Sequence, residues 1–438
     1  MKSQRAYPRL TVSAKAERAI RSGHPWVYDA EVKRVEINGG EGTQEDIANG
    51  SFVDVVNPKG AYLGTGFISL TSKIRVRLVT RNANDRMDAA FWERKVRWAW
   101  QYRMQTLGDT DARACRVLFS EADGFPGLIV DRFEDVLVTQ TLSRGMEVLK
   151  PVVFPALVRV LREEGVAIRG IYERNDVAAR SHEGLEPTCG WWPLEAPLEA
   201  PLGAGTDATA DPNTDAYGPT ETEFTENGVR YHVDFANGQK TGFFLDQKYN
   251  RRAVARLAHG RRVLDCFTHT GSFALNAAVG GAEHVTAVDI SETAIAMASR
   301  NAQLNGFGPD STAIDFQVRN VFELLTELEA RHAEDYDFII LDPPAFTKSR
   351  RTVDSASRGY KDINLRALKV LPRGGYLATA SCSHFMDVDR FRRMMFSAAR
   401  DAGVQLRQIE ERQQAPDHPI VWGIPETDYL KFFIFQVV

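Results

Sequence analysis

The sequence predicts an α/β protein whose C-terminal part is a Rossmann-like domain that binds a nucleoside. Val263–Leu264 is an apolar strand that stops at Asp265, and a turn over Thr268–Gly271 leads into a helix with apolar residues at helical spacing. Val285–Val288 is a second apolar strand. It ends at Asp289, 24 residues after Asp265, near the roughly 20 expected for a carboxylate that binds ribose hydroxyls. The alternative is a βαβ unit without a ligand.

The composition of the turn narrows the choice of cofactor. The only glycine after the strand is Gly271, so the motif that approaches a dinucleotide pyrophosphate is absent. S-adenosylmethionine (SAM) carries adenosine without a pyrophosphate and fits better. The loop over Gly238–Gln247 has the density of glycines and aromatics that suits closure over a ligand, with a well-packed turn as the alternative. We expect these residues to bind the cofactor: Asp265, Phe267, Thr270, Gly271, Asp289, Asn320, Asp342 and Gln247.

Length and composition set the broad class. A chain of 438 residues is expected to hold two or three domains. Its four cysteines are scattered without C-x-x-C spacing, and its nine histidines show no H-E-x-x-H, so we expect a reduced, cytoplasmic protein without a metal. The N-terminus has no secretion signal and no apolar run approaches 18 residues, so no membrane partner is expected.

The charge distribution is uneven, although the net charge is −4. Residues 183–229 contain ten acidic and no basic residues. Residues 1–34 carry eight Lys/Arg against three acids, and residues 71–103 carry nine against three. Basic stretches of this kind could follow an RNA backbone, with ordinary solvated faces as the alternative.

Residues 1–80 are predicted to form a small, compact β-barrel. A short strand at Leu10–Val12 and a helix at Lys15–Arg21 precede two strands, 52–56 and 62–68, around a hairpin turn. Ile74–Val79 alternates apolar with basic residues, which places Arg75 and Arg77 together on an outer, basic face that suits structured RNA.

Residues 81–185 are predicted to form an α/β middle domain. A helix over 88–107 is followed by three strands that turn at Asp123–Gly127 and Arg132–Asp135, then by a helix over Glu147–Glu164 and a strand over Gly170–Glu173. Residues 186–222 are rich in Pro, Gly, Ala, Thr and Asp. They are predicted to be a poorly ordered linker or insert that SAM binding does not need.

Residues 223–438 are predicted to form the nucleoside-binding domain. A strand at Tyr231–Phe235 and a helix to about His259 precede the βαβ unit, and a helix capped by Ser291 ends at Asn305-Gly306. Further strands are expected at Phe316–Val318, Phe338–Leu341, Tyr376–Thr379 and around Leu430–Val437. A basic loop after the fourth strand is expected to contain Lys348, Arg350, Arg351, Arg358 and Lys361.

Two neighbouring strand ends carry the candidate chemistry. Asp342-Pro343-Pro344 puts a carboxylate on a stiff loop, and Cys382 follows the next strand. C5 of cytosine reacts poorly with a sulfonium methyl group until a thiolate adds at C6, and a carboxyl near N3 can donate a proton as that bond forms. Cys382 as nucleophile and Asp342 as its acid partner therefore form a coherent pair. A lone cysteine is otherwise usually a small core residue.

Seven motifs occur in a specific order along nearly the whole chain: H-P-W-V-Y (24–28), E-A-D-G-F-P-G (121–127), K-T-G-F-F-L-D-Q (240–247), D-C-F-T-H-T-G (265–271), D-P-P-A-F (342–346), R-G-Y-K-D-I-N (358–364) and S-C-S (381–383). With them the sequence resembles the bacterial SAM-dependent RNA cytosine-C5 methyltransferases that carry an N-terminal PUA domain. The resemblance is to those that modify large-subunit (23S) ribosomal RNA.

This resemblance implies a class I methyltransferase domain at 224–438, a PUA barrel at 1–80, and a middle domain that helps to hold RNA. It implies that Cys382 is the nucleophile. Ala345 stands where other RNA C5 methyltransferases have a second cysteine, Asn320 where Asp is frequent, and His384 where small residues are common. Candidate substrate-binding residues are Lys240, Pro343, Phe346, Lys348, Arg358, Tyr360 and Lys361. A homodimer is compatible with the sequence.

Two other functions are compatible with the sequence. A SAM-dependent N-methyltransferase would act on an exocyclic amine through the D-P-P loop, although such sites usually have an aromatic residue where this chain has Ala345. A non-catalytic RNA-binding or assembly protein would keep the fold without methyl transfer.

Overall fold

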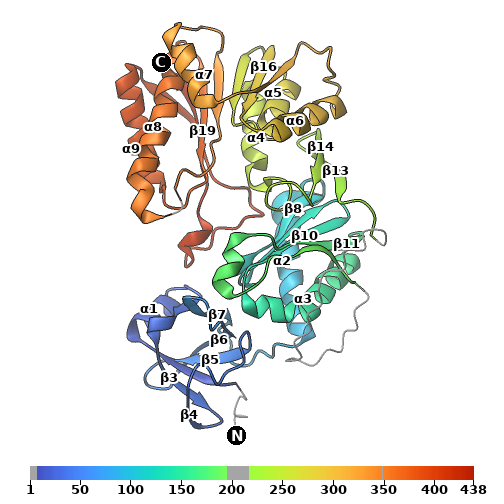
Figure 1. Cartoon of the computed structure of the whole chain (residues 1–438), viewed down its shortest axis with the longest axis vertical. Helices are drawn as coiled ribbons and strands as arrows, with labels where there is room; N and C mark the ends of the chain where they lie inside the picture. The colour runs from blue at the N-terminus through green and yellow to red at the C-terminus, as the bar shows by residue number, and fades with distance from the viewer. Residues whose placement is uncertain (1–6, 195–216, 348) are drawn as a thin grey trace. The chain divides into compact units, whose positions relative to one another are not determined.

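The computed structural model describes residues 7–194, 217–347 and 349–438 (Figure 1). The predicted α/β class is confirmed: the chain has a β-rich N-terminal domain, an α/β middle domain and a C-terminal Rossmann-like domain. It divides into two compact units. The first comprises Met1–Thr222, Val233–Phe243 and Pro416–Thr427, and the second comprises Glu223–His232, Phe244–Ala415 and Asp428–Val438.

The N-terminal domain is a seven-stranded sheet with the order β2-β7-β6-β5-β1-β3-β4. Its strands enclose a core of aliphatic residues, and helix α1 begins after Ser13, whose hydroxyl accepts a hydrogen bond from Ala16 N at 3.2 Å. The elements are β1 (Arg9–Val12), α1 (Ala14–Arg21), β2 (Trp26–Tyr28), β3 (Val32–Ile37), β4 (Gly40–Gly42), β5 (Phe52–Val56), β6 (Tyr62–Ile68) and β7 (Ile74–Thr80).

The basic outer face predicted for β7 is wrong. Arg75 donates to Asp29 Oδ1 at 2.9 Å. Arg77 donates to Glu121 Oε1 at 2.7 Å and to Glu183 Oε1 at 3.2 Å, and its guanidinium lies 5.3 Å from the centroid of the Trp26 ring. Alternation along the strand did place the two arginines on one face. That face is covered by acidic and aromatic partners distant in sequence, so these arginines are not free to bind phosphate.

The middle domain is a five-stranded sheet, β12-β11-β10-β9-β8, packed against two long helices. Its elements are α2 (Ala89–Asp111), β8 (Ala114–Phe119), β9 (Leu128–Phe133), β10 (Val136–Thr141), α3 (Arg144–Glu163), β11 (Gly170–Arg174) and β12 (Cys189–Trp192). Trp92 and Trp100 of α2 are buried in the core between sheet and helices, whereas Trp98 is 61% exposed. Most of the aromatic content of α2 therefore stabilises the fold.

Strand β12 corrects the prediction that residues 186–222 are a poorly ordered linker. It pairs antiparallel with β11, and Trp191 is 0% exposed. The Trp191 ring stacks on Tyr217 at 5.4 Å and meets Tyr172 at 5.3 Å and Phe235 at 5.6 Å. The prediction rested on the average composition of the segment, which does not reveal the short strand pattern of Cys189–Trp192. Residues 195–216 of the predicted insert lie outside the described residues.

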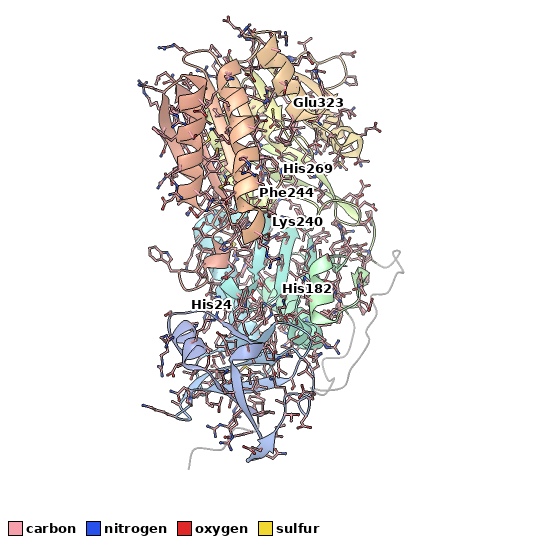
Figure 2. All side chains as sticks on the ribbon, turned by 60° about the vertical axis from the view of Figure 1, so that its left-hand side comes forward. His24, His182, Lys240, Phe244, His269 and Glu323 are labelled. Carbon is pink, nitrogen blue, oxygen red and sulfur yellow. The ribbon has the colours of Figure 1, made fainter. Side chains whose placement is uncertain are left out.

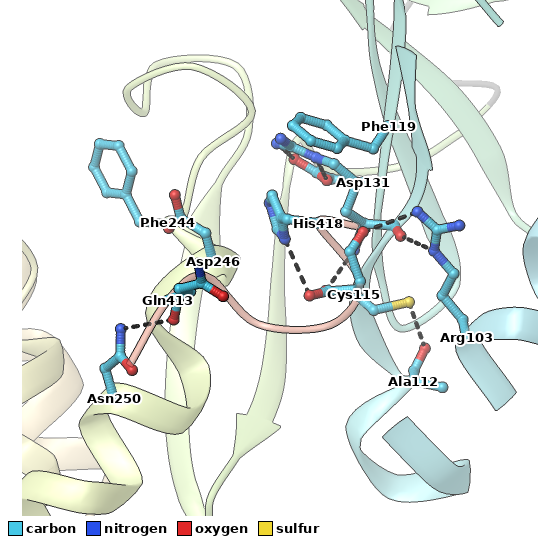
Figure 3. Close-up of polar contacts among 12 residues, drawn as sticks. Arg103, Ala112, Cys115, Phe119, Asp131, Phe244, Asp246, Asn250, Gln413 and His418 are labelled. Atoms are coloured by element: carbon cyan, nitrogen blue, oxygen red, sulfur yellow. Dashed lines mark hydrogen bonds and ion pairs between the residues drawn. The ribbon is translucent and has the colours of Figure 1, made fainter. Parts of the chain in front are cut away.

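The segment Pro416–Thr427 comes from the C-terminal part of the sequence but packs in the first compact unit (Figure 3). Arg103 donates to Asp417 O at 2.8 Å, and Arg116 N donates to Asp417 Oδ2 at 2.9 Å. Arg103 is fully buried and also forms a bidentate pair with Asp123 at 2.6 and 2.7 Å. A buried arginine with all these acceptors fixes the segment on the middle domain.

The Rossmann-like domain contains a seven-stranded sheet with the order β17-β16-β15-β18-β19-β21-β20. Neighbours from β17 to β19 are parallel, and β21 runs antiparallel to both β19 and β20. The strands are β15 (Arg262–Cys266), β16 (His284–Asp289), β17 (Ile314–Val318), β18 (Phe338–Leu341), β19 (Tyr376–Ser381), β20 (Leu406–Arg412) and β21 (Lys431–Val437). β13 (Glu221–Glu226) and β14 (Val229–Asp234) form a separate two-stranded sheet.

Helices cover both faces of this sheet (Figure 1). One apolar core joins it to α7, α8 and α9, and another joins it to α4 and α5. The helices are α4 (Lys248–Leu257), α5 (Ser272–Val279), α6 (Glu292–Leu304), α7 (Val321–Ala330), α8 (Val353–Val370) and α9 (Val388–Ala402). The basic loop predicted after β18 is wrong for Arg358 and Lys361, because both lie on α8. No helix among the described residues is long and apolar enough to cross a membrane.

Replacing Trp191 by alanine is expected to lower the free energy of unfolding by about 3–5 kcal/mol, because a large aromatic side chain leaves a buried cavity. Chemical denaturation of the full chain measures this change. Trp98→Ala, on the exposed side of α2, is the matched control and should change stability little. Equal stability of Trp191→Ala and the parent protein would show that β12 is dispensable, as a linker would be.

Candidate active site

The carboxyl ends of five parallel strands define the candidate site. The chain runs from β15 outward to β16 and β17, then returns to place β18 on the other side of β15. Ligands of open α/β sheets bind beyond the strand ends at such a reversal. Asp265 lies in β15, Asp289 ends β16, and Asp342 directly follows β18. Strand β15 runs one residue past Asp265, where it was predicted to stop.

The turn after β15 has an unusual backbone that two carboxylates hold in place. Phe267 and His269 have φ values of 63° and 51°, in the left-handed region that costs free energy for residues other than glycine. Asp265 Oδ2 accepts hydrogen bonds from Thr268 Oγ1 at 2.5 Å and from Ala274 N at 2.9 Å. Asp289 Oδ2 accepts from His269 N at 2.9 Å. The strained turn is therefore specified by the acids at two strand ends.

Gly271 ends the turn and begins α5. Its φ is +81°, and a Cβ there would lie 3.0 Å from the Cβ of Ala298. A larger residue would push the turn away from α6. Backbone conformation and close packing against α6 therefore both require glycine at this position.

Asp265 is a fully buried carboxyl whose pKa burial raises to about 7, with the Asp342 and Asp289 charges adding to that rise. Because the folded-state pKa is raised, the stability that Asp265 contributes is present below its ordinary pKa and is lost as pH rises through about 7. Its Oδ1 and the Thr270 hydroxyl are buried and have no hydrogen-bond partner among the residues that the structure describes. Orphaned polar atoms at a strand end are what a bound polar ligand would satisfy.

A second group of contacts joins the loop before α4 to the D-P-P loop. Gln247 Nε2 donates to Asp342 Oδ1 at 3.0 Å, and Gln247 Oε1 accepts from Asn250 Nδ2 at 2.5 Å. The neighbouring Phe244 ring meets His269 edge to face, with 5.3 Å between the ring centroids. Figure 2 labels both residues. Burial lowers the pKa of His269. Residues predicted from separate motifs, Gln247 and Asp342, are therefore in direct contact.

Cys382 directly follows β19, whose Thr379 is paired with Leu341 of β18. Tyr360 of α8 interacts with groups at both strand ends: burial, together with the charges of Cys382 and Asp342, raises its pKa to about 12. Its ring packs 4.5 Å from the ring of Phe346. Tyr360 is fully buried, so it supports the D-P-P loop and does not present a surface to a substrate. Pro343 is buried as well.

The other predicted site residues are dispersed. Asn320 caps α7, and its Oδ1 accepts a hydrogen bond from Phe322 N at 2.9 Å. Lys361 is ion-paired with Asp401 of α9, and Arg358 is exposed on α8. Lys240 belongs to the first compact unit, with φ 53°, and Lys348 lies outside the described residues. No cluster of three or more potential metal ligands occurs in the described part of the chain.

Sequence reasoning missed Lys431, the first residue of β21. Its Nζ donates to Ser383 O at 2.6 Å and to Tyr429 O at 2.7 Å, and the residue is 5% exposed. The signal was available in the sequence, since Lys431 is the one charged residue in the run Y-L-K-F-F-I-F-Q-V-V. A lysine at the start of an apolar strand is seldom buried without a reason.

Comparison with known proteins gives two family matches. Residues 214–433 match the model of S-adenosylmethionine-dependent methyltransferases, and residues 10–81 match that of a PUA-like domain. The chain is 35% identical over 432 residues to "Ribosomal RNA large subunit methyltransferase I" of Klebsiella pneumoniae (strain 342), covering 99% of both chains. It is 36% identical over 433 residues to the protein of that name from Salmonella typhimurium, covering 99% of this chain and 98% of the other.

Solved structures support the fold over the same extent. A SAM-dependent methyltransferase from Streptococcus mutans is 21% identical, with a TM-score of 0.75 and coverage of 98% of this chain and 100% of that one. A structure of the methyltransferase SMU.776 with bound SAH is 20% identical, with a TM-score of 0.76 and the same coverage. These likenesses extend over all three domains.

Asp289→Ala is expected to weaken SAM binding about 10- to 150-fold, because hydrogen bonds to a charged acceptor contribute roughly 1.5–3 kcal/mol. Each Asp289 oxygen accepts one backbone N–H, from His269 or from Ser291, and keeps a lone pair for a ribose hydroxyl. Titration calorimetry measures the affinity. Asp315→Ala, an exposed acid on β17, is the control and should bind SAM normally. Unchanged affinity in Asp289→Ala would exclude the proposed ribose contact.

Proposed function

Because the chain belongs to the S-adenosylmethionine-dependent methyltransferases, in the family of ribosomal RNA large subunit methyltransferase I, we propose that it forms 5-methylcytosine in 23S ribosomal RNA. SAM is its cofactor. The substrate is supported by the names of relatives that match along 99% of the chain and by the PUA-like domain. The observation that carries the proposed chemistry is the presence of Cys382 and Asp342 after two paired, parallel strands.

The residues at the strand ends fit SAM. Asp289 would accept the ribose hydroxyls, and the unpartnered Oδ1 of Asp265 would accept from the amino group of the methionine part. The Thr270 hydroxyl is a further unpartnered group at the same turn. Asn320 remains the candidate for the adenine amine, and Phe267 and Gln247 remain candidates for other contacts with the cofactor. When bound, SAM supplies an electrophilic methyl group.

The target cytosine would leave its stack and enter this site. The Cys382 thiolate forms a bond to C6 of the ring, and Asp342 donates a proton to N3, so that C5 becomes the nucleophile that accepts the methyl group. A base then removes the C5 proton, the C6–S bond breaks, N3 returns its proton to Asp342, and the thiolate is regenerated. The hydrogen bond from Gln247 holds the Asp342 carboxyl in orientation through this cycle.

Methylation of an exocyclic amine is the second candidate function. The D-P-P loop is the one feature that favours this function, because the loop could bind an exocyclic amine and the reaction would not need a nucleophilic thiol. The residue after the second proline is Ala345, so the aromatic that usually stacks on the target base there is missing. A non-catalytic RNA-binding protein would have no need for the unpartnered Asp265 and Thr270 atoms.

RNA containing 5-fluorocytosine at the target position should become covalently attached to the protein in the presence of SAM. Fluorine at C5 blocks the final proton removal, so the Cys382–C6 bond cannot break. A denaturing gel detects the adduct as a shifted band. Cys382→Ala should bind SAM normally and give neither adduct nor turnover, and Asp342→Ala should lose turnover because C6 addition needs the proton at N3.

Cys266 provides the matched control. It is fully buried in β15, and burial raises the pKa of its thiol well above the ordinary value. Cys266→Ala should therefore still form the adduct. Methylation of cytosine by Cys382→Ala, or an adduct carried by Cys266, would contradict the mechanism.

A further inference from the structure

Lys431 is hydrogen-bonded to the loop that carries Cys382. It begins β21 and is opposite Ser381, the last residue of β19, in the antiparallel register. From there its side chain reaches across the strand end, so that Nζ donates to the carbonyl of Ser383, the residue after Cys382. The ammonium group is thus bonded to the backbone one residue after the thiol, and it also donates to the carbonyl of Tyr429, which precedes β21.

The charge on Lys431 is poorly compensated by its hydrogen bonds. Both acceptors are neutral carbonyl oxygens, and no carboxylate within the described ranges lies within ion-pair distance of Nζ. Burial lowers the pKa of Lys431 to about 8, while the charges of Asp428, Cys382 and Asp387 act to raise it. At pH 7 the group is still mainly protonated. A buried ammonium with this environment favours an anion nearby.

We propose that Lys431 is a positioning residue that stabilises the thiolate of Cys382. The inference rests on the proposed function, in which that thiolate is the nucleophile. The thiolate is the reactive form of cysteine, and a neighbouring cation increases its population. Lys431 is buried and Cys382 is half-buried, so the attraction between the two charges is stronger than it would be between two fully exposed groups.

The other titratable groups around this cluster are three carboxylates, Tyr360 and the exposed His384, whose Nδ1 lies 3.3 Å from the carbonyl oxygen of Asp428. Asp387 and Asp428 interact with Lys431, and Asp342 and Cys382 interact with the phenol of Tyr360. The three carboxylates disfavour a further negative charge, and Tyr360 is neutral near pH 7. Lys431 therefore supplies a buried positive charge that is hydrogen-bonded to the loop that carries Cys382.

A purely structural role for Lys431 is the competing explanation. The two carbonyl bonds could serve only to clamp the loop after β19. Arginine keeps the charge and the donors, methionine keeps the approximate shape without charge, and glutamine keeps a donor without charge. The reactivity of Cys382 as a function of pH separates the two roles, because a clamp does not set the ionisation of the thiol.

The experiment measures alkylation of each cysteine by iodoacetamide between pH 6 and pH 10, with mass spectrometry of the full-length chain and its variants. In the wild type, Cys382 should titrate below the ordinary thiol pKa of about 8.5. Lys431→Met should raise that apparent pKa by about one unit, roughly a tenfold loss of alkylation rate at pH 7, and Lys431→Arg should retain the wild-type value. The exposed Cys189 is the internal reference and should not change.

An unchanged pKa of Cys382 in a folded Lys431→Met or Lys431→Gln protein would overturn the proposal, with folding judged by thermal melting and SAM binding. If neither uncharged variant folds, the measurement on the wild-type protein tests the proposal. An apparent pKa of Cys382 at or above about 8.5 in the wild type also overturns the proposal. The readout needs no RNA. The two proposals can fail separately. If the pKa of Cys382 depends on Lys431 but Cys382→Ala still methylates RNA, the proposed function is wrong and the inference about Lys431 is still supported.

Discussion

Parallel pairing among β15, β18 and β19 is the constraint on which the candidate site depends. Leu341 is in register with Cys266 on one side and with Thr379 on the other, so Asp342 leaves its strand between the turn that follows β15 and the strand that Cys382 follows. These groups come from positions far apart in the sequence. A shift of register would separate them and would turn buried apolar residues to the wrong face. The same pairing that builds the core therefore also assembles the chemistry.

Two buried ionisable groups of the candidate site, Asp265 and Lys431, have no ion-pair partner among the described residues. Asp265 is a carboxyl whose pKa burial raises to about 7, and Lys431 is an ammonium whose pKa burial lowers to about 8. Both shifts oppose the charged form, so each group lowers stability when it ionises. The bidentate Arg251–Glu226 pair shows the contrasting case of matched buried charges, whereas Lys95 is a second ammonium whose pKa burial lowers to about 8. Unmatched charge at the strand ends is consistent with a site prepared for a ligand and a reaction.

The sequence predicted those features that depend on local pattern. Apolar runs identified the strands from Val263 to Leu341, and glycine and serine marked the ends of helices. The prediction of a basic face on β7 was wrong because it depended on partners distant in sequence. The sequence pattern exposes Arg75 and Arg77, but in the structure they are paired with acidic residues of other segments: Asp29, Glu121 and Glu183. The strand β12 was not predicted, because the biased composition of its segment concealed four residues with a strand pattern. The role of Lys431 was not predicted, because a charged residue in an apolar run gives no indication of which groups it contacts.

The most direct test of the account is the identity of the methylated atom. Full-length protein is incubated with SAM and with 23S ribosomal RNA that lacks modifications, the RNA is digested to nucleosides, and these are separated and identified by mass spectrometry. The account predicts 5-methylcytidine as the product, made by the wild type and absent with Cys382→Ala. Formation of N4-methylcytidine or another methylated nucleoside in its place, or no methylated nucleoside at all, would contradict it.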